Sequence, residues 1–94
     1  MTQKNAQSYD ILHLFLIQVQ VLNVHEVRNL ETKLEKLGVI LYDGYLRGAD
    51  DWHRPTIRSA CYIVAVKADR VQALKASLRL LDREMASSIS YRPL

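Results

Sequence analysis

The sequence predicts one α+β domain with the element order β-α-β-β-α-β, a four-stranded antiparallel sheet and two helices on one of its faces. Two segments place apolar residues at the three- and four-residue spacing of an amphipathic helix, and four others have the apolar patterns of strands. The chain has 94 residues, of which 49% are hydrophobic. That length supports one hydrophobic core and is too short for two.

The first predicted strand covers residues 10–21, and the polar, aperiodic residues 1–8 before it predict a flexible arm, which leaves residues 9–94 as the folded domain. One face of the strand carries Ile11, His13, Phe15, Ile17, Val19 and Val21, and the other carries Leu12, Leu14, Leu16, Gln18 and Gln20. Because its first half is apolar on both faces, we expect the strand to be central or covered by a partner. His13 is expected in the core.

The first helix is predicted over residues 24–37. Asn23 can cap it, and Glu26 stands three residues later, in the capping-box position. Gly38 stands where helices commonly end in a left-handed residue. The apolar stripe is Val24, Val27, Leu30, Leu34 and Leu37, which leaves Arg28, Glu31, Lys33, Glu35 and Lys36 toward water.

The middle of the chain contains two strands and the segment that joins them. One strand begins at Val39 and runs to Tyr42, or as far as Arg47. The stretch GYLRGADDWHRP contains two glycines and a proline, which indicates a turn or loop. Residues 57–67 form the next strand, with Tyr62, Val64 and Val66 on one face and Cys61, Ile63 and Ala65 on the other.

The second helix is expected to begin at a cap formed by Asp69, with Gln72 in the box position and Val71, Leu74, Leu78 and Leu81 as its apolar stripe. Met85–Arg92 is predicted as the last strand. Two right-handed β-α-β halves in this order form a ferredoxin-like sandwich. Since both helices lie on one face, the other sheet face must be polar or shielded by another molecule.

Charge is distributed unevenly along the chain. Residues 1–43 contain four Lys/Arg and five Asp/Glu (net −1), whereas residues 44–94 contain nine and five (net +4), and seven of those nine are arginines. Guanidinium groups suit phosphate recognition, which favours an anionic partner such as nucleic acid, although a solvated surface has the same composition. Apolar runs such as Leu14–Ile17 are too short to span a bilayer, so no membrane partner is expected.

Residues for catalysis or metal binding are scarce. Asp50, Asp51 and His53 could ligate a divalent ion, but adjacent aspartates are ordinary in turns and no second ligand cluster accompanies them. Cys61, the only cysteine, cannot form an internal disulfide and is predicted to be buried and inert. We therefore expect a protein that is not an enzyme and has no catalytic residues, metal or cofactor.

Two groups of basic residues are candidates for RNA binding. In the predicted loop, Trp52 accompanies Arg47, His53, Arg54 and Arg58, a mixture that can stack on bases and hold phosphates. The alternative is a tryptophan that caps the end of the core. On the second helix, one stripe contains Gln72, Lys75, Arg79 and Arg83, which fits either a phosphate backbone or a solvated face.

The order of several short motifs resembles the family of protein six of the bacterial-type small ribosomal subunit. The motifs are Tyr9-Asp10-Ile11 at the first strand, Asp51-Trp52-His53-Arg54, the run Tyr62–Ala68, and Leu78–Asp82 followed by Ile89–Arg92. Together they cover about residues 9–92, and their order and spacing are more specific than any one motif. The chain departs from the family at Pro55–Arg58, where members have a longer run similar to Leu-Ala-Tyr-Pro-Ile.

The resemblance implies a structural constituent of the small ribosomal subunit that binds ribosomal RNA and a neighbouring protein, small-subunit protein eighteen. On this reading the RNA-binding residues are the loop group, the three basic residues of the helix stripe and Arg92: Arg47, Trp52, His53, Arg54, Arg58, Lys75, Arg79, Arg83 and Arg92. Leu12, Leu14, Leu16, Tyr42 and Tyr45 would then form the protein-partner interface. The divergence favours a mitochondrial ribosome, with the bacterial cytoplasm or a plastid as alternatives.

Two other functions fit the same fold. One is a small-ligand sensor of the nitrogen-regulatory (PII-like) type, in which the segment between the second and third strands is the signalling loop; Tyr45–Ala49 is faintly similar to it. The other is a metal-dependent ribonuclease, which needs an acidic residue at the end of its first strand. This chain has Gln20, Val21 and Leu22 there.

Overall fold

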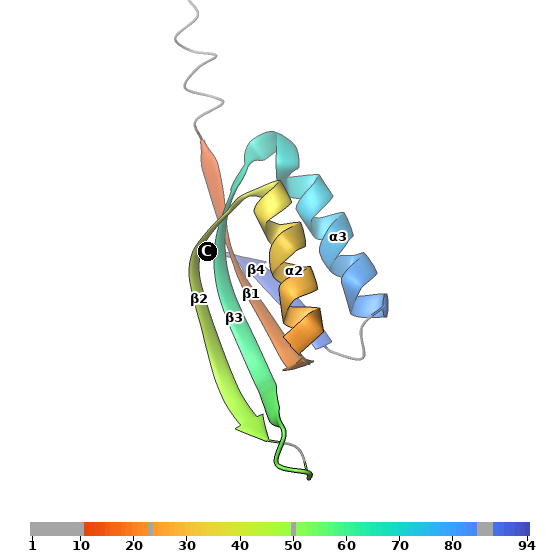
Figure 1. The fold of residues 1–94 in the computed structure, drawn as a ribbon. Helices are drawn as coiled ribbons and strands as arrows, with labels where there is room; N and C mark the ends of the chain where they lie inside the picture. Colours follow the sequence, from red (N-terminus) through yellow and green to blue (C-terminus); the bar gives the residue numbers. More distant parts are fainter. Residues whose placement is uncertain (1–10, 23, 50, 85–87) are drawn as a thin grey trace, which may run out of the picture.

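The computed structural model describes residues 11–22, 24–49, 51–84 and 88–94. Its elements are β1 (Leu12–Leu22), α2 (Val24–Leu37), β2 (Val39–Ala49), β3 (Pro55–Lys67), a 3-10 turn (Ala68–Arg70), α3 (Val71–Glu84) and β4 (Ser88–Pro93). Figure 1 shows α2 and α3 together in front of one face of the sheet. The fold is α+β with a ferredoxin-like arrangement, as the sequence predicts.

The sheet has four strands in the order β2-β3-β1-β4, and all its neighbours are antiparallel. β1 is central, as expected from its two apolar faces: Leu16 lies opposite Ile63 of β3 on one side and Arg92 of β4 on the other. Because side chains alternate along a strand, this register determines which residues share each face.

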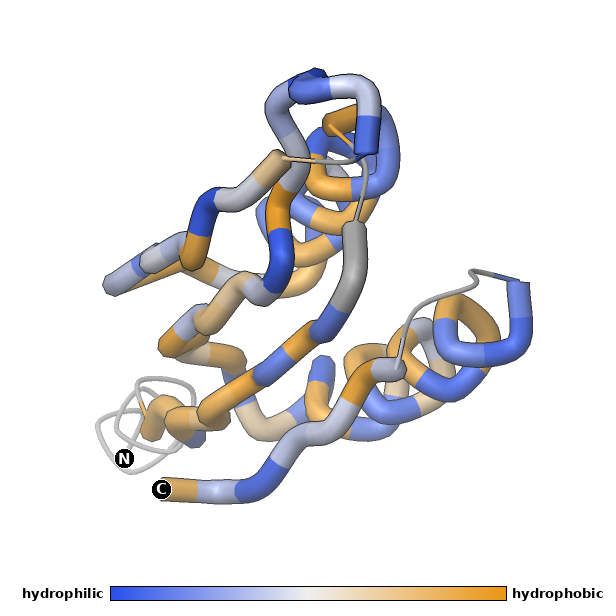
Figure 2. The backbone as a smooth tube through the Cα atoms, turned by 90° about the horizontal axis from the view of Figure 1, so that it is seen from below, coloured by the Kyte–Doolittle hydropathy of each residue, from blue (hydrophilic) through white to orange (hydrophobic). Residues whose placement is uncertain are grey.

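The core lies between the sheet and the two helices. Its fully buried side chains include Ile17 and Tyr62 from the sheet, Leu30 from α2 and Leu78 from α3. Tyr91 of β4 packs edge-on against Phe15 with ring centroids 6.5 Å apart. Figure 2 shows hydrophobic positions along the inner sides of the helices, toward the sheet. Burial of each such leucine contributes about 1.5–3 kcal/mol, so packing holds the helices on this face.

Gly38 ends α2 for a reason that differs from the prediction. No described glycine has a positive φ, so Gly38 is not the left-handed residue expected there. Its amide donates to the carbonyl oxygen of Leu34 at 2.9 Å. A Cβ at Gly38 would lie 2.3 Å from the carbonyl oxygen of Ala65, so close backbone approach requires glycine. The predicted cap, Asn23, lies outside the described residues.

The start of α3 also differs from the prediction. Asp69 lies inside the 3-10 turn and is not the cap of the helix, which begins at Val71. At the other end, Asp82 accepts a hydrogen bond from the amide of Ile89 at 2.9 Å, which ties α3 to β4. Met85, where the last strand was expected to begin, lies outside the described residues, and β4 begins at Ser88.

Three further expectations are wrong. The stretch predicted as a loop is mostly strand, because β2 continues to Ala49 and β3 begins at Pro55. His13 is exposed near the start of β1 and does not lie in the core. Cys61 is only half-buried, because it points to the sheet face that the helices do not cover. The predicted arm, residues 1–8, is outside the described part of the chain.

Candidate functional site

The sheet face opposite the helices, called the open face below, is arranged as four rows of side chains. The pairing of the strands gives these rows across β4, β1, β3 and β2: Leu94, Leu14, Ala65, Val39; Arg92, Leu16, Ile63, Tyr42; Ser90, Gln18, Cys61, Gly44; and Ser88, Gln20, Ser59, Leu46. The first two rows are apolar apart from Arg92, whereas the last two are largely polar. The open face therefore has an apolar half and a polar half.

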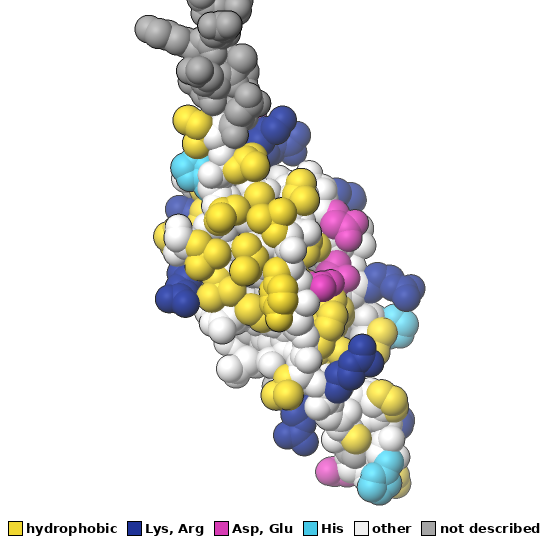
Figure 3. All heavy atoms as spheres, turned by 90° about the vertical axis from the view of Figure 1, so that its left-hand side faces the viewer, with side chains coloured by type: hydrophobic (Ala, Val, Ile, Leu, Met, Phe, Trp, Pro, Cys, Tyr) yellow, Lys and Arg dark blue, Asp and Glu magenta, His cyan; other side chains and the backbone are white. Residues whose placement is uncertain are grey.

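The apolar half exposes large hydrophobic side chains to solvent. Leu14 is 39% exposed, Tyr42 54% and Val39 62%, and Leu12 beyond the first row is 53% exposed. Figure 3 shows a continuous patch of hydrophobic side chains over the sheet. A contiguous patch of this kind typically marks an interaction surface. The expected partner residues Leu12, Leu14, Leu16 and Tyr42 all lie on this open face.

Tyr45 does not share that surface. It lies opposite Ala60, whose side chain is in the core, and its hydroxyl donates to Glu31 Oε2 on α2. The hydroxyl of Tyr62 donates to the same oxygen at 2.8 Å, and the two tyrosine rings meet edge-on with centroids 6.2 Å apart. Tyr45, Glu31 and Tyr62, called the Glu31 cluster below, connect α2 to β2 and β3.

The Glu31 cluster holds both phenols in their neutral form. Burial, and then the hydrogen bond to Glu31, raise the pKa of Tyr45 from 10.0 to about 12. The same two causes raise the pKa of Tyr62 well above its ordinary value. Asp43 Oδ2, 3.3 Å from the Tyr45 hydroxyl, adds to the negative charge beside it. The cluster is a structural connection between the layers, and Glu31 is not the solvated residue that the helical pattern predicts.

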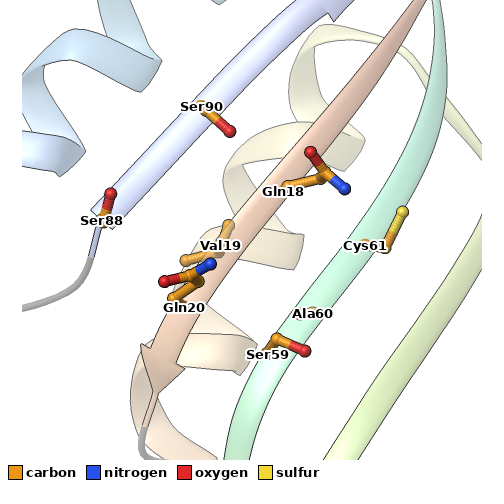
Figure 4. A pocket seen from close by; sticks show the side chains of 8 residues that line it. All are labelled: Gln18, Val19, Gln20, Ser59, Ala60, Cys61, Ser88 and Ser90. Atoms are coloured by element: carbon orange, nitrogen blue, oxygen red, sulfur yellow. The ribbon is translucent and has the colours of Figure 1, made fainter.

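The polar half of the open face contains a depression of about 240 Å³. Figure 4 shows the amides of Gln18 and Gln20 on β1 between the serines of β4 and the residues of β3. Its polar side chains are neutral amides and hydroxyls with the thiol of Cys61 beside them: Gln18, Gln20, Ser59, Ser88 and Ser90. Groups of this kind can exchange hydrogen bonds with water or with a neutral partner, and they place no charge on the sheet.

The hairpin of β2 and β3 extends past the end of β1, whose last residue, Leu22, pairs with Ile57. The part from Arg47 to Arg58, called the basic hairpin below, carries Arg47 opposite Ile57 and Arg58 on the other face of the ribbon. A Cβ at Gly48 would lie 2.3 Å from Arg58 Nε, so the arginine side chain lies across this glycine. The sequence-predicted loop residues thus gather on one projecting element.

The turn of the basic hairpin presents the other three predicted residues, Trp52, His53 and Arg54, all of them exposed. Trp52 is 77% exposed, so it does not cap the core, which was the alternative interpretation. His53 adopts a φ of 62°, the left-handed region that residues other than glycine seldom occupy. His53 therefore has a role in turning the chain, whatever it contacts outside.

The remaining predicted RNA-binding residues do not join this hairpin in one surface. Lys75, Arg79 and Arg83 lie on α3, over the covered face of the sheet; Arg79 and Arg83 are exposed and Lys75 is partly buried. Arg92 lies on the opposite, open face, at the edge strand β4. The structure thus divides the predicted set into three separate locations.

The described residues contain no candidate metal site. Within residues 11–22, 24–49, 51–84 and 88–94, no three His, Cys, Asp or Glu side chains gather where they could hold a metal ion. Asp51 and His53 are in the turn, and Asp50, the third member of the predicted ligand group, falls in a gap between the described ranges. No helix in the described part of the chain is long and apolar enough to cross a membrane.

Two features of the site escape sequence reasoning. In the Glu31 cluster, Tyr45 is 14 positions and Tyr62 is 31 positions from Glu31 along the chain. No local sequence pattern indicates contacts between residues so far apart. The polar half of the open face depends on the register of three strands, although the change from leucine to glutamine along β1 is a visible signal of it.

Comparison with known proteins identifies a fold and no family. No family model matches the chain, and no curated protein matches it. The chain is similar to a solved structure of a protein of unknown function from Galdieria sulphuraria, with a TM-score of 0.72 and 15% identity over 88% of this chain and 50% of that one. The chain thus spans about half the length of that neighbour, and at this identity the likeness shows the fold alone: both contain an α+β unit of the ferredoxin-like arrangement.

Proposed function

We propose that this chain is a non-catalytic RNA-binding protein that forms part of a ribonucleoprotein particle. The observation that carries the proposal is the basic hairpin, which projects beyond the sheet with Arg47, Arg54 and Arg58 and with the exposed ring of Trp52 near its tip. Arginines on a narrow ribbon can reach phosphates on both sides of a groove or of a folded strand.

The two faces of the hairpin suggest how RNA is held. Arg47 and Arg58 point to opposite faces of the ribbon, so they contact different phosphate groups and do not compete for one. Trp52, 77% exposed, provides a surface on which an unpaired base can stack. The basic residues of α3 supply a second, weaker contact on the covered side of the molecule.

The small ribosomal subunit is the first particle to test, since the motif order resembles its protein six. In that setting the protein would have a structural role in a mitochondrial ribosome, or in a bacterial or plastid one. Co-sedimentation of the chain with small ribosomal subunits at low salt, and its release at high salt, is the expected result. A chain that stays in the soluble pool would contradict the ribosomal assignment and leave RNA binding to be decided by the next experiment.

Salt-dependent binding to a labelled single-stranded RNA tests the hairpin directly. Each phosphate contact contributes about 0.7 to the slope of log K against log salt, so replacing all three hairpin arginines by alanine should lower the slope by about 2. The control removes the same charge from α2 with Arg28→Ala, Lys33→Ala and Lys36→Ala. Equal losses in both triple variants would show non-specific attraction by net charge and would overturn the proposal, as would the absence of RNA binding.

A small-ligand regulator is the second candidate, favoured by the projecting hairpin between β2 and β3, because this segment is the signalling element of the nitrogen-regulatory type. A nucleotide that raises the melting temperature of the chain would favour this candidate. The hairpin arginine variants distinguish the two functions. If the chain binds RNA, these variants lose RNA affinity; if it is a small-ligand regulator, they change the nucleotide-induced shift in melting temperature.

A further inference from the structure

The open face as a whole is large enough to be an interface. From Leu12 to Gln20, β1 spans about 27 Å at ~3.4 Å per residue, and four strands spaced at ~4.8 Å make the face about 19 Å wide. The projected area is about 500 Å², and the accessible area is larger because side chains stand out from the sheet. A standard interface buries about 800 Å² on each partner, so the open face is of the size that a stable pair needs.

The two margins of the open face carry opposite charge. Arg92 stands in the second row on the edge strand β4. At the opposite edge, Glu35 of α2 lies beside Leu41 and Tyr42 around a depression beyond β2. Glu31 and Asp43 also line this depression, where they lie beside the Tyr45 hydroxyl on the covered side of the sheet. Figure 3 shows acidic side chains along one margin of the hydrophobic patch only, whereas Lys and Arg side chains lie on both sides of it. The apolar rows therefore lie between Arg92 at the β4 edge and the acidic side chains beyond β2.

We propose that the open face binds a second copy of this chain in a two-fold pair whose axis runs along the strands. A rotation of 180° about such an axis places β4 of one copy over β2 of the other. Arg92 of each copy then lies over the acidic margin of its partner, and apolar rows lie over apolar rows. A two-fold axis across the strands would instead place β4 over β4 and reverse the order of the rows, so that apolar rows would lie over polar rows and Arg92 would not reach the acidic margin of the partner.

A second copy fits this face better than RNA or an unrelated protein. Exposed leucines offer nothing to a phosphate backbone, which argues against RNA on the apolar half. An unrelated partner would need its own matching pattern of charge, whereas this chain already contains both halves of the match. Two sheets packed in this way are aligned and about 10 Å apart, the usual spacing of a β-sandwich.

The pair has consequences for the rest of the surface. Because the axis runs along the strands, both basic hairpins project from the same end of the pair. The polar rows of the two copies face one another, which gives their amides and hydroxyls neutral partners. The inference does not depend on RNA binding, since it uses a surface separate from the basic hairpin, and Leu14 variants leave the hairpin intact.

The test is the solution mass of the full chain, by sedimentation equilibrium over micromolar to sub-millimolar concentrations. The wild-type chain is expected to be a dimer, and Leu14→Glu a folded monomer. The matched control is Leu80→Glu, because Leu80 is 50% exposed on α3, away from the open face, and should remain a dimer. A monomeric or trimeric wild type, or a Leu14→Glu variant that still pairs, would overturn the proposal.

Charge exchange tests the orientation of the pair. Arg92→Glu should weaken dimerisation by about tenfold, since it sets like charges opposite each other twice in the pair, and adding Glu35→Lys should restore it. Failure of the restoring change would rule out the axis along the strands.

The thiol of Cys61 provides a measurement that needs no variant. Cys61 is half-buried in the third row of the open face. Its rate of reaction with a bulky thiol reagent should fall as the protein concentration rises, because pairing covers the face. A rate that does not depend on concentration would contradict the proposal, even if the Leu14 variant did not fold.

Discussion

Replacement of Tyr62 by phenylalanine measures how strongly the Glu31 cluster holds α2 on the sheet. The Tyr62 side chain has no exposed surface, and its hydroxyl donates to Glu31 Oε2 at 2.8 Å. Hydrogen bonds to charged groups contribute about 1.5–3 kcal/mol. Glu31 is only half-buried and keeps the bond from Tyr45, so the lower end of that range applies. We expect a loss of about 1.5 kcal/mol, or about 6–12 °C in melting temperature for a domain of this size.

Urea unfolding at one fixed protein concentration is the assay, because association would make the stability depend on concentration. The slope against urea should not change, which would show that the same surface is exposed on unfolding. Tyr91→Phe is the matched control, since phenylalanine keeps the edge-on contact of Tyr91 with Phe15. If Tyr62→Phe loses no more stability than Tyr91→Phe, the Glu31 cluster does not stabilise the layers.

Two other predictions concern pH and backbone packing. Since the folded-state pKa of Tyr45 is raised from 10.0 to about 12, its contribution to stability is complete below pH 10 and is lost as the pH rises toward 12. The free energy of unfolding, measured between pH 10 and pH 12, should fall as the pH rises. In Tyr45→Phe this fall should be smaller. A steeper fall in the variant would contradict the assignment of the pH dependence to Tyr45. Gly38→Ala should cost about 1–3 kcal/mol in thermal or urea unfolding, because its Cβ would lie 2.3 Å from the carbonyl oxygen of Ala65. An unchanged stability would show that the backbone relaxes there.

The element order and the sheet's central strand follow from sequence patterns because those patterns are local. The three- and four-residue spacing of Leu30 and Leu34 predicts α2, and the structure buries both residues against the sheet. The leucines at alternate positions of β1 predict a second apolar face, and they do occupy the open face. Hydrophobic periodicity is strong in these segments, so the prediction succeeds.

The length of β2 could not be predicted, because its glycines resemble turn residues. Gly44 lies inside β2, and a Cβ there would come within 2.7 Å of the Tyr42 hydroxyl. Gly48, also in β2, makes room for Arg58. At both positions a neighbouring side chain lies so close to the backbone that a Cβ would clash with it. Such contacts between residues are not specified by the local sequence.

The position of Tyr45 shows the same limit for the candidate site. A bulge between Ile40 and Tyr42 changes the alternation along β2, so Tyr45 faces α2 while Tyr42 stays on the open face. A reader of the sequence who does not know of the bulge cannot tell from the alternation of side chains which of the two tyrosines lies on the open face.

The most direct test of the central claim is ultraviolet cross-linking of the full chain to RNA, followed by mass spectrometry of its peptides. We expect nucleotide adducts on peptides of the basic hairpin, with Trp52 among the modified positions. Adducts confined to α2, or no adducts at all under conditions where a known RNA-binding protein gives them, would contradict it.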